Sequence, residues 1–123
     1  MQGYHANIED LTLANEFFRK VLFTGPNSQL VLMALQPGEE IGREVHQDHD
    51  QFFRFEQGAG KVEVDGSKFQ VSDGLAVVVP AGAWHNVINT GKQILKLYTI
   101  YSPPEHKDGT VHKTKAEALA AHH

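Results

Sequence analysis

The chain contains no cysteine. This absence excludes disulfides, thiolate zinc sites and cysteine nucleophiles, and it fits a reducing compartment. The sequence also lacks an apolar run long enough to cross a bilayer, and its N-terminus shows no signal-peptide pattern. We therefore expect a soluble cytoplasmic protein with no membrane partner.

Positive charge is scarce. The 11 lysines and arginines stand against 15 acidic residues, which leaves a net charge of −4 without a basic stripe. Nucleic acids and anionic membranes are therefore poor candidate partners. No glycine-rich nucleotide motif and no serine-nucleophile motif is present either. Histidine, by contrast, is plentiful; His122 and His123 are interpreted as tag remnants or native residues without a role in function.

The length of 123 residues fits one domain spanning residues 1–123. Turn signals built from Gly, Pro, Asn and Asp recur at short, regular intervals between runs of β-favouring residues. This regularity predicts an all-β antiparallel sandwich or barrel. We expect an N-terminal segment over 1–15, the barrel over 16–101 and a C-terminal tail over 102–123, packed on the barrel surface.

Several local patterns predict individual elements. Asn7 and Thr114 are placed to cap a short helix near each end of the chain. The mostly apolar run 29–36 is typical of a strand that is covered on both faces. The pair Asp65-Gly66, between two short runs of alternating polarity, predicts a tight hairpin because glycine tolerates a positive φ.

Potential metal ligands concentrate in residues 38–58, GEEIGREVHQDHDQFFRFEQG. Within eight residues, this segment carries four donors: Glu44, His46, His49 and Gln51. A second segment, residues 74–89, adds His85. Oxygen and imidazole donors without sulfur suit a borderline divalent cation.

Strand alternation predicts which of these side chains share a face. Residues two apart in a strand point to the same side, so Glu44 and His46 are expected to face one way together. On the following strand, Gln51, Phe53 and Phe55 share a face. If Gln51 faces inward, the two aromatic side chains line the same cavity.

The spacing of these residues resembles the two motifs of the cupin superfamily, G-x5-H-x-H-x(3,4)-E-x6-G and G-x5-P-x-G-x2-H-x3-N. The second motif is complete, with Gly74, Pro80, Gly82, His85 and Asn89 at the required intervals. The first motif matches in spacing from Gly38 to Gly58, but Glu44 replaces the first histidine and Gln51 replaces the glutamate. The sequence of residues 44–62 is similar to that of small bacterial cupins labelled mannose-6-phosphate isomerase-like.

The resemblance implies a double-stranded β-helix, that is, a jelly-roll cupin barrel, with short terminal helices. It also implies one divalent transition metal, Fe, Mn, Ni, Co or Zn, held by His46, His85, Glu44 and Gln51. Relative to the family pattern, the single negative charge moves from position 51 to position 44. Gln51 either contacts the metal or hydrogen-bonds a metal-bound water, and the alternative for both histidines is a hydrogen bond in the core.

For the other candidate residues, a purely structural role is the alternative to a functional one. Glu44 is a metal ligand or a solvated acid at the barrel rim, and His49 is an exposed loop histidine or a proton-transfer group. Phe53 and Phe55 are core residues first, since aromatic side chains dominate β cores, and candidate substrate contacts second. Tyr101 reaches the cavity with its hydroxyl if its strand faces inward.

The resemblance leaves three functions open. The first is a metal-dependent enzyme of isomerase or lyase type on a sugar or related polar small molecule, with Glu44 or His49 as the catalytic proton carrier. The second is a transition-metal dioxygenase, and the third is a non-catalytic module that binds a small molecule. A sugar phosphate is disfavoured, since Arg54 has outward parity and no other cation has a clear inward assignment. We also expect a homodimer, because residues 94–101 are apolar on both faces.

Overall fold

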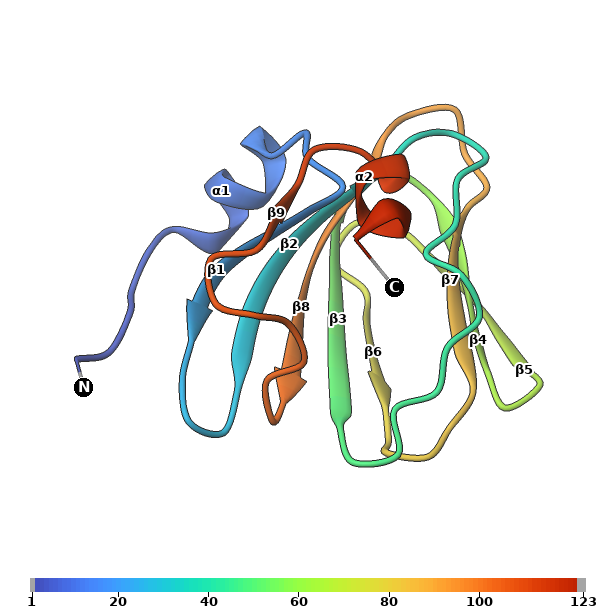
Figure 1. Ribbon diagram of the computed structural model, residues 1–123. Helices are drawn as coiled ribbons and strands as arrows, with labels where there is room; N and C mark the ends of the chain where they lie inside the picture. The colour runs from blue at the N-terminus through green and yellow to red at the C-terminus, as the bar shows by residue number, and fades with distance from the viewer. Residues whose placement is uncertain (1, 122–123) are drawn as a thin grey trace.

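The computed structural model describes residues 2–121 of the protein, so His122 and His123 lie outside the described residues. Two short helices flank nine β-strands (Figure 1). In chain order the elements are α1 (Ile8–Ala14), β1 (Arg19–Thr24), β2 (Gln29–Leu35), β3 (Asp50–Gln57), β4 (Gly60–Val64), β5 (Ser67–Val71), β6 (Ala76–Val79), β7 (His85–Asn89), β8 (Leu95–Ser102), β9 (Val111–His112) and α2 (Lys115–Ala120).

The strands form two antiparallel sheets that face each other across the core. The larger sheet has the order β6-β3-β8-β2-β1-β9, and the smaller one has the order β5-β4-β7. Sequence neighbours such as β2 and β3 are separated in this order, and β8 lies between them. This is the jelly-roll arrangement that the sequence predicted.

The local predictions are confirmed. The Asn7 side chain accepts a hydrogen bond from the amide of Asp10 at the start of α1, and Thr114 accepts one from the amide of Glu117 at the start of α2. The β4–β5 hairpin turns at Asp65 and Gly66, both with a positive φ.

The core is built from the inward faces of both sheets. Phe53 and Phe55 of β3 are 0% exposed, as are Val62 of β4 and Val87 of β7 on the opposing sheet. The outer face of the larger sheet is covered in part by α1, and the Lys96 ammonium of β8 donates to the carbonyl of the last turn of α1 at Leu13. The predicted strand over 29–36 is thus covered on both faces over Gln29–Leu35, whereas Gln36 is exposed.

The tail returns to the barrel more closely than the sequence indicated. Its β9 pairs with β1, so the larger sheet extends beyond the expected barrel boundary at residue 101. Residues 105 and 106 are pinned by Gln29, whose side-chain oxygen accepts hydrogen bonds from both backbone amides. Across residues 2–121, neither helix is long and apolar enough to span a membrane.

Candidate metal centre

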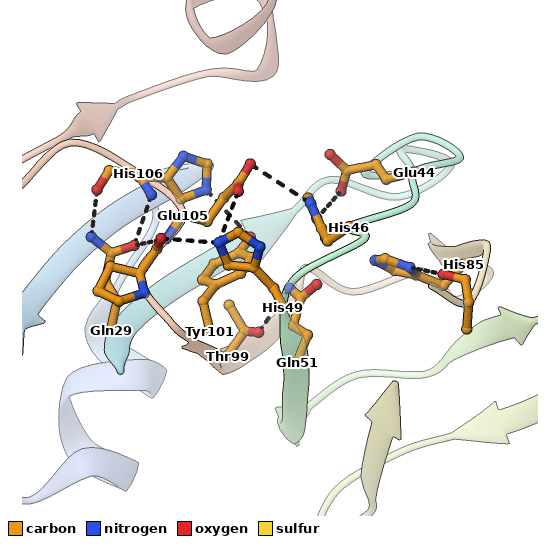
Figure 2. Close-up of polar contacts among 12 residues, drawn as sticks. Gln29, Glu44, His46, His49, Gln51, His85, Thr99, Tyr101, Glu105 and His106 are labelled. Atoms are coloured by element: carbon orange, nitrogen blue, oxygen red, sulfur yellow. Dashed lines mark hydrogen bonds and ion pairs between the residues drawn. The ribbon is translucent and has the colours of Figure 1, made fainter. Parts of the chain in front are cut away.

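Glu44, His46 and His85 converge at one end of the barrel interior (Figure 2). One potential ligand atom from each lies within 4.8 Å of the others. The His46 Nε2 to Glu44 Oε1 distance is 3.9 Å, and the two imidazole centroids are 5.5 Å apart. An ion between these groups would need only small side-chain adjustments to reach ligand distances of about 2.0–2.3 Å.

The backbone brings these residues together in a way that strand alternation did not anticipate. Residues 42–46 are not part of a strand; only an isolated bridge joins Glu44 to His85. In that bridge each residue donates its amide to the carbonyl of the other, at 2.9 Å in both directions. The carbonyl of His46 then accepts from the amide of Gly82 at 2.9 Å. The predicted convergence is present, but a loop fastened to β7 produces it.

Gln51 enters from β3 and is 2% exposed. Its side-chain Nε2 donates to Thr99 Oγ1 of β8 at 3.0 Å, which fixes the orientation of the amide. The Oε1 atom of the same amide is buried and has no hydrogen-bond partner. The structure therefore presents a carbonyl-type oxygen at the position where the cupin pattern has a carboxylate.

Buried polar atoms without a hydrogen-bond partner indicate whether these residues could hold a metal. Among residues 2–121, five buried side-chain polar atoms lack a hydrogen-bond partner, and three of them are His46 Nε2, Gln51 Oε1 and His85 Nε2. Leaving such an atom unpaired costs about 1–3 kcal/mol each. His85 Nδ1 lies 3.1 Å from the carbonyl of Ala83, which can only accept, so Nε2 carries the lone pair. All three atoms are electron-pair donors, and with the Glu44 carboxylate they fit a divalent cation.

The protonation of His85 also suits this assignment. Burial lowers the pKa of His85 below its ordinary value, although the Ala83 carbonyl and the Glu44 carboxylate act in the opposite direction. The side chain is thus neutral near pH 7. Neutral imidazole is the form that binds a metal.

Tyr101 and the two phenylalanines form the walls around this cluster. The Tyr101 side chain is 2% exposed, and burial raises the pKa of its hydroxyl far above the usual range, so it remains a hydrogen-bond donor. The ring packs edge-on against His46 at 5.9 Å, and the ring of Phe53 lies 6.2 Å from that of His85. Phe55 lies deeper, stacked on Phe53. The role of these three residues in substrate binding stays a prediction.

His49 is not an exposed loop residue. Its side chain is 18% exposed, and its Nε2 lies 3.0 Å from the carbonyl of Pro104 and 3.4 Å from Glu105 Oε1. The carbonyl can only accept, so this nitrogen carries a proton. The alternative prediction, that His49 is an exposed loop histidine, is therefore wrong, because the C-terminal tail folds over this residue.

Glu105 was missed in the sequence. Its Oε2 lies 3.7 Å from His46 Nδ1, on the side of the ring opposite the metal cluster. A carboxylate behind a ligating histidine holds the ring in the tautomer with its lone pair on Nε2. No cupin motif position marks Glu105, and the turn-rich tail gave no signal that this residue would return to the site. His46, His49 and Glu105 also form a compact donor group, in which the His49 Nε2 proton is directed at the carbonyl of Pro104.

Comparison with known proteins identifies the class. The cupin domain family matches residues 31–101, and the chain belongs to this family. The chain is 55% identical over 121 residues to the uncharacterized protein YrkC of Bacillus subtilis, covering 94% of this chain and 65% of YrkC. It is 43% identical over 115 residues to the uncharacterized protein L612 of Acanthamoeba polyphaga mimivirus, covering 89% of this chain and 71% of L612.

Among solved structures, BH2720 from Bacillus halodurans superposes with a TM-score of 0.95 at 48% identity, covering 97% of this chain and 95% of that one. The small-cupin fold is thereby confirmed. The mannose-6-phosphate isomerase-like subgroup is not confirmed by these matches. The chain spans 65% of the length of YrkC, so the activity of that whole protein is not assigned to this chain.

Proposed function

We propose that the protein holds one divalent transition metal through His46, His85 and Glu44, with Gln51 Oε1 as a fourth donor. We further propose that it uses this ion in isomerase or lyase chemistry on a sugar or related oxygen-rich small molecule. The observation that carries the proposal is the meeting of two histidines, each with a buried, unpartnered Nε2, beside the Glu44 carboxylate. Buried polar atoms of a plain core are normally hydrogen-bonded.

A bound ion would supply a Lewis acid for adjacent hydroxyl and carbonyl oxygens of the substrate, and would acidify the C–H bond between them. The chain itself then has to move a proton. Glu44 is less suited to this when it binds the ion, whereas His49 is backed by Glu105 and Pro104 through its Nε2. In the neutral form of His49, Nδ1 is the nitrogen that takes the proton, and the Glu105 carboxylate stabilises the resulting cation.

Other side chains of the site orient the substrate and exclude water. The protonated Tyr101 hydroxyl can donate to a substrate oxygen, and it already lies 3.3 Å from His106 Nε2. Phe53 is fully buried beside His85 and keeps this side of the site dry. A dry wall strengthens each electrostatic interaction in the site.

Elemental analysis tests the metal proposal directly. Protein purified without a metal-affinity column should carry close to one divalent transition ion per chain, and Glu44→Ala should lose most of it while remaining folded. Asp48→Ala is the matched control, because Asp48 is an exposed acid in the same loop. Equal metal content in Glu44→Ala and wild type would contradict the ligand assignment.

Solvent exchange tests the chemistry. In deuterated water, a metal-loaded sample should incorporate deuterium beside the carbonyl of a substrate drawn from a panel of hydroxy-aldehydes and hydroxy-ketones, as followed by NMR. His49→Gln should lose this exchange but keep its metal. Exchange that persists unchanged in His49→Gln would remove His49 from the catalytic role.

One observation favours a second candidate function. Two histidines and one carboxylate with open positions is the ligand set of non-haem iron oxygenases, and Glu44, His46 and His85 supply it. Oxygen consumption by the iron-loaded protein, without solvent exchange, would favour this dioxygenase reading. Metal and ligand binding with neither reaction would favour the non-catalytic binding module.

A further inference from the structure

A buried arginine lies in the barrel wall next to the metal cluster. Arg19 opens β1, where its parity with the buried Val21 turns it inward, and it is 4% exposed. In the sequence, Arg54 has outward parity and no other cation has a clear inward position. Arg19 supplies the inward-facing guanidinium that the sequence analysis did not find.

Arg19 forms no ion pair with any acidic side chain of residues 2–121. Its contacts are a hydrogen bond from Nη1 to His112 Nδ1 at 3.3 Å and the ring of Phe18 at 5.2 Å from the guanidinium carbon. Its Nε is buried without a hydrogen-bond partner, and none of the ion pairs found in residues 2–121 includes it. A buried guanidinium normally pairs with an anion, because desolvating an unpaired charge is costly.

Arg19 and Glu44 line the same cavity of about 230 Å³. At about 30 Å³ per water in the liquid, this is room for roughly seven or eight waters, which suits a small organic acid and not a large ligand. Among the described residues, three cations and one acid line it: Arg19, Arg43, Lys115 and Glu44. The cavity therefore favours an anion, and Glu44 connects it to the metal cluster.

We propose that this cavity binds the negatively charged end of the substrate, a carboxylate or a phosphate, through the Arg19 guanidinium. The inference rests on the proposed function, since it assigns the substrate class of the same site: an oxygen-rich small molecule whose hydroxyl and carbonyl oxygens reach the metal while its anionic end meets Arg19.

The test uses zinc-loaded protein, since zinc is diamagnetic, and three probes: lactate, its neutral analogue lactamide, and inorganic phosphate. Binding is followed by NMR, including the signal of the Arg19 Nε–H group. We expect lactate or phosphate to move that signal, and we expect lactate to bind at least tenfold more tightly than lactamide. The comparison of lactate with phosphate shows which anion the site prefers. Lactate that binds wild type no more tightly than lactamide, together with phosphate that leaves the Arg19 signal in place, overturns the proposal.

Two variants separate the effect of Arg19 on anion binding from the effect of the protein's overall charge. Arg19→Met keeps the apolar stem and should abolish the preference for lactate, whereas Lys20→Met, at an exposed position of the same strand, should preserve it. Retention of the preference in Arg19→Met overturns the proposal. If that variant does not fold, Arg19→Lys takes its place; it should weaken lactate and phosphate severalfold, and unchanged binding counts against the proposal.

Zinc content, measured on the same samples, keeps the two ideas distinguishable. Wild type that binds zinc but shows no anion preference refutes the anion site alone. Wild type that lacks zinc but prefers lactate over lactamide refutes the metal assignment and retains the anion site.

Discussion

Gln51→Glu is the substitution that most sharply separates a ligand from a structural amide. Gln51 is 2% exposed, its Nε2 bonds Thr99, and its Oε1 has no partner. The substitution replaces the unpartnered neutral oxygen with a carboxylate and removes the Nε2 donor, although the Thr99 hydroxyl can rotate and donate to the new carboxylate. We therefore expect opposite effects on the metal-free and metal-loaded protein.

Without metal, the variant buries a second acid near Glu44. The cost of burying an ionised carboxylate is limited by its protonation, and we estimate a loss of about 2 kcal/mol in the free energy of unfolding. For a chain of this size that corresponds to a fall in Tm of roughly 8 °C. Thermal unfolding in the presence of a chelator measures this effect.

With metal, the new charge lies against a divalent cation. Two unit charges at about 4 Å attract by roughly 4 kcal/mol at an effective dielectric constant of 20, and a divalent ion roughly doubles this, but desolvation removes the larger part. We expect at least tenfold tighter binding, about 1.4 kcal/mol, in competition with a chromophoric chelator. Unchanged metal affinity would place Gln51 behind a metal-bound water, and weaker affinity would refute the reasoning. Gln47→Glu adds the same charge at an exposed position of the neighbouring loop and serves as the control.

Three further expectations concern the tail, the core and the assembly. Glu105→Gln should weaken metal binding by about 10- to 100-fold, because the carboxylate behind His46 orients the ring; chelator competition measures the affinity, and wild-type affinity would remove Glu105 from that role. Gly60→Ala should destabilise the protein by about 2–3 kcal/mol in denaturant unfolding, since an added Cβ would lie 2.7 Å from a backbone carbonyl oxygen of β7, whereas Gly3→Ala meets nothing within 4 Å and should be neutral. The homodimer remains a prediction: light scattering should give twice the chain mass, and Val78→Lys, at an exposed apolar position on the edge strand β6, should shift it toward the monomer, while a monomeric wild type would contradict the dimer.

Local chemistry and fixed spacing made most of the fold predictable. The caps at Asn7 and Thr114 and the hairpin at Asp65 each depend on a few adjacent residues, and the structure confirms them. The cupin spacing places His85 at the start of β7 and Gln51 at a buried position near the start of β3. These are cases where short-range signals and the global arrangement agree.

The remaining parts of the site depend on long-range packing, which spacing does not encode. Glu105 reaches His46 only because Gln29, on a distant strand, fixes the backbone of residues 105 and 106. His49 was read as exposed for the same reason, because its cover comes from Pro104. Arg19 has the sequence signature of an ordinary polar residue at the start of a strand, but in the structure it faces inward and pairs with His112 of β9.

These long-range contacts give a physical reason for the position of the negative charge. At position 51, a carboxylate would be 2% exposed and would lose the amide donor that now bonds Thr99. At position 44 it borders both the metal cluster and the cavity that contains Arg19. There it can bind the ion on one side while the uncompensated guanidinium remains available to a substrate anion on the other. Among the described residues that line this cavity Glu44 is the only acid, so its removal would leave Arg19, Arg43 and Lys115 there without a negative group. Glu44→Ala should therefore keep the preference for lactate over lactamide even after its metal is lost, and loss of that preference in the variant would show that the metal, and not Arg19, attracts the anion.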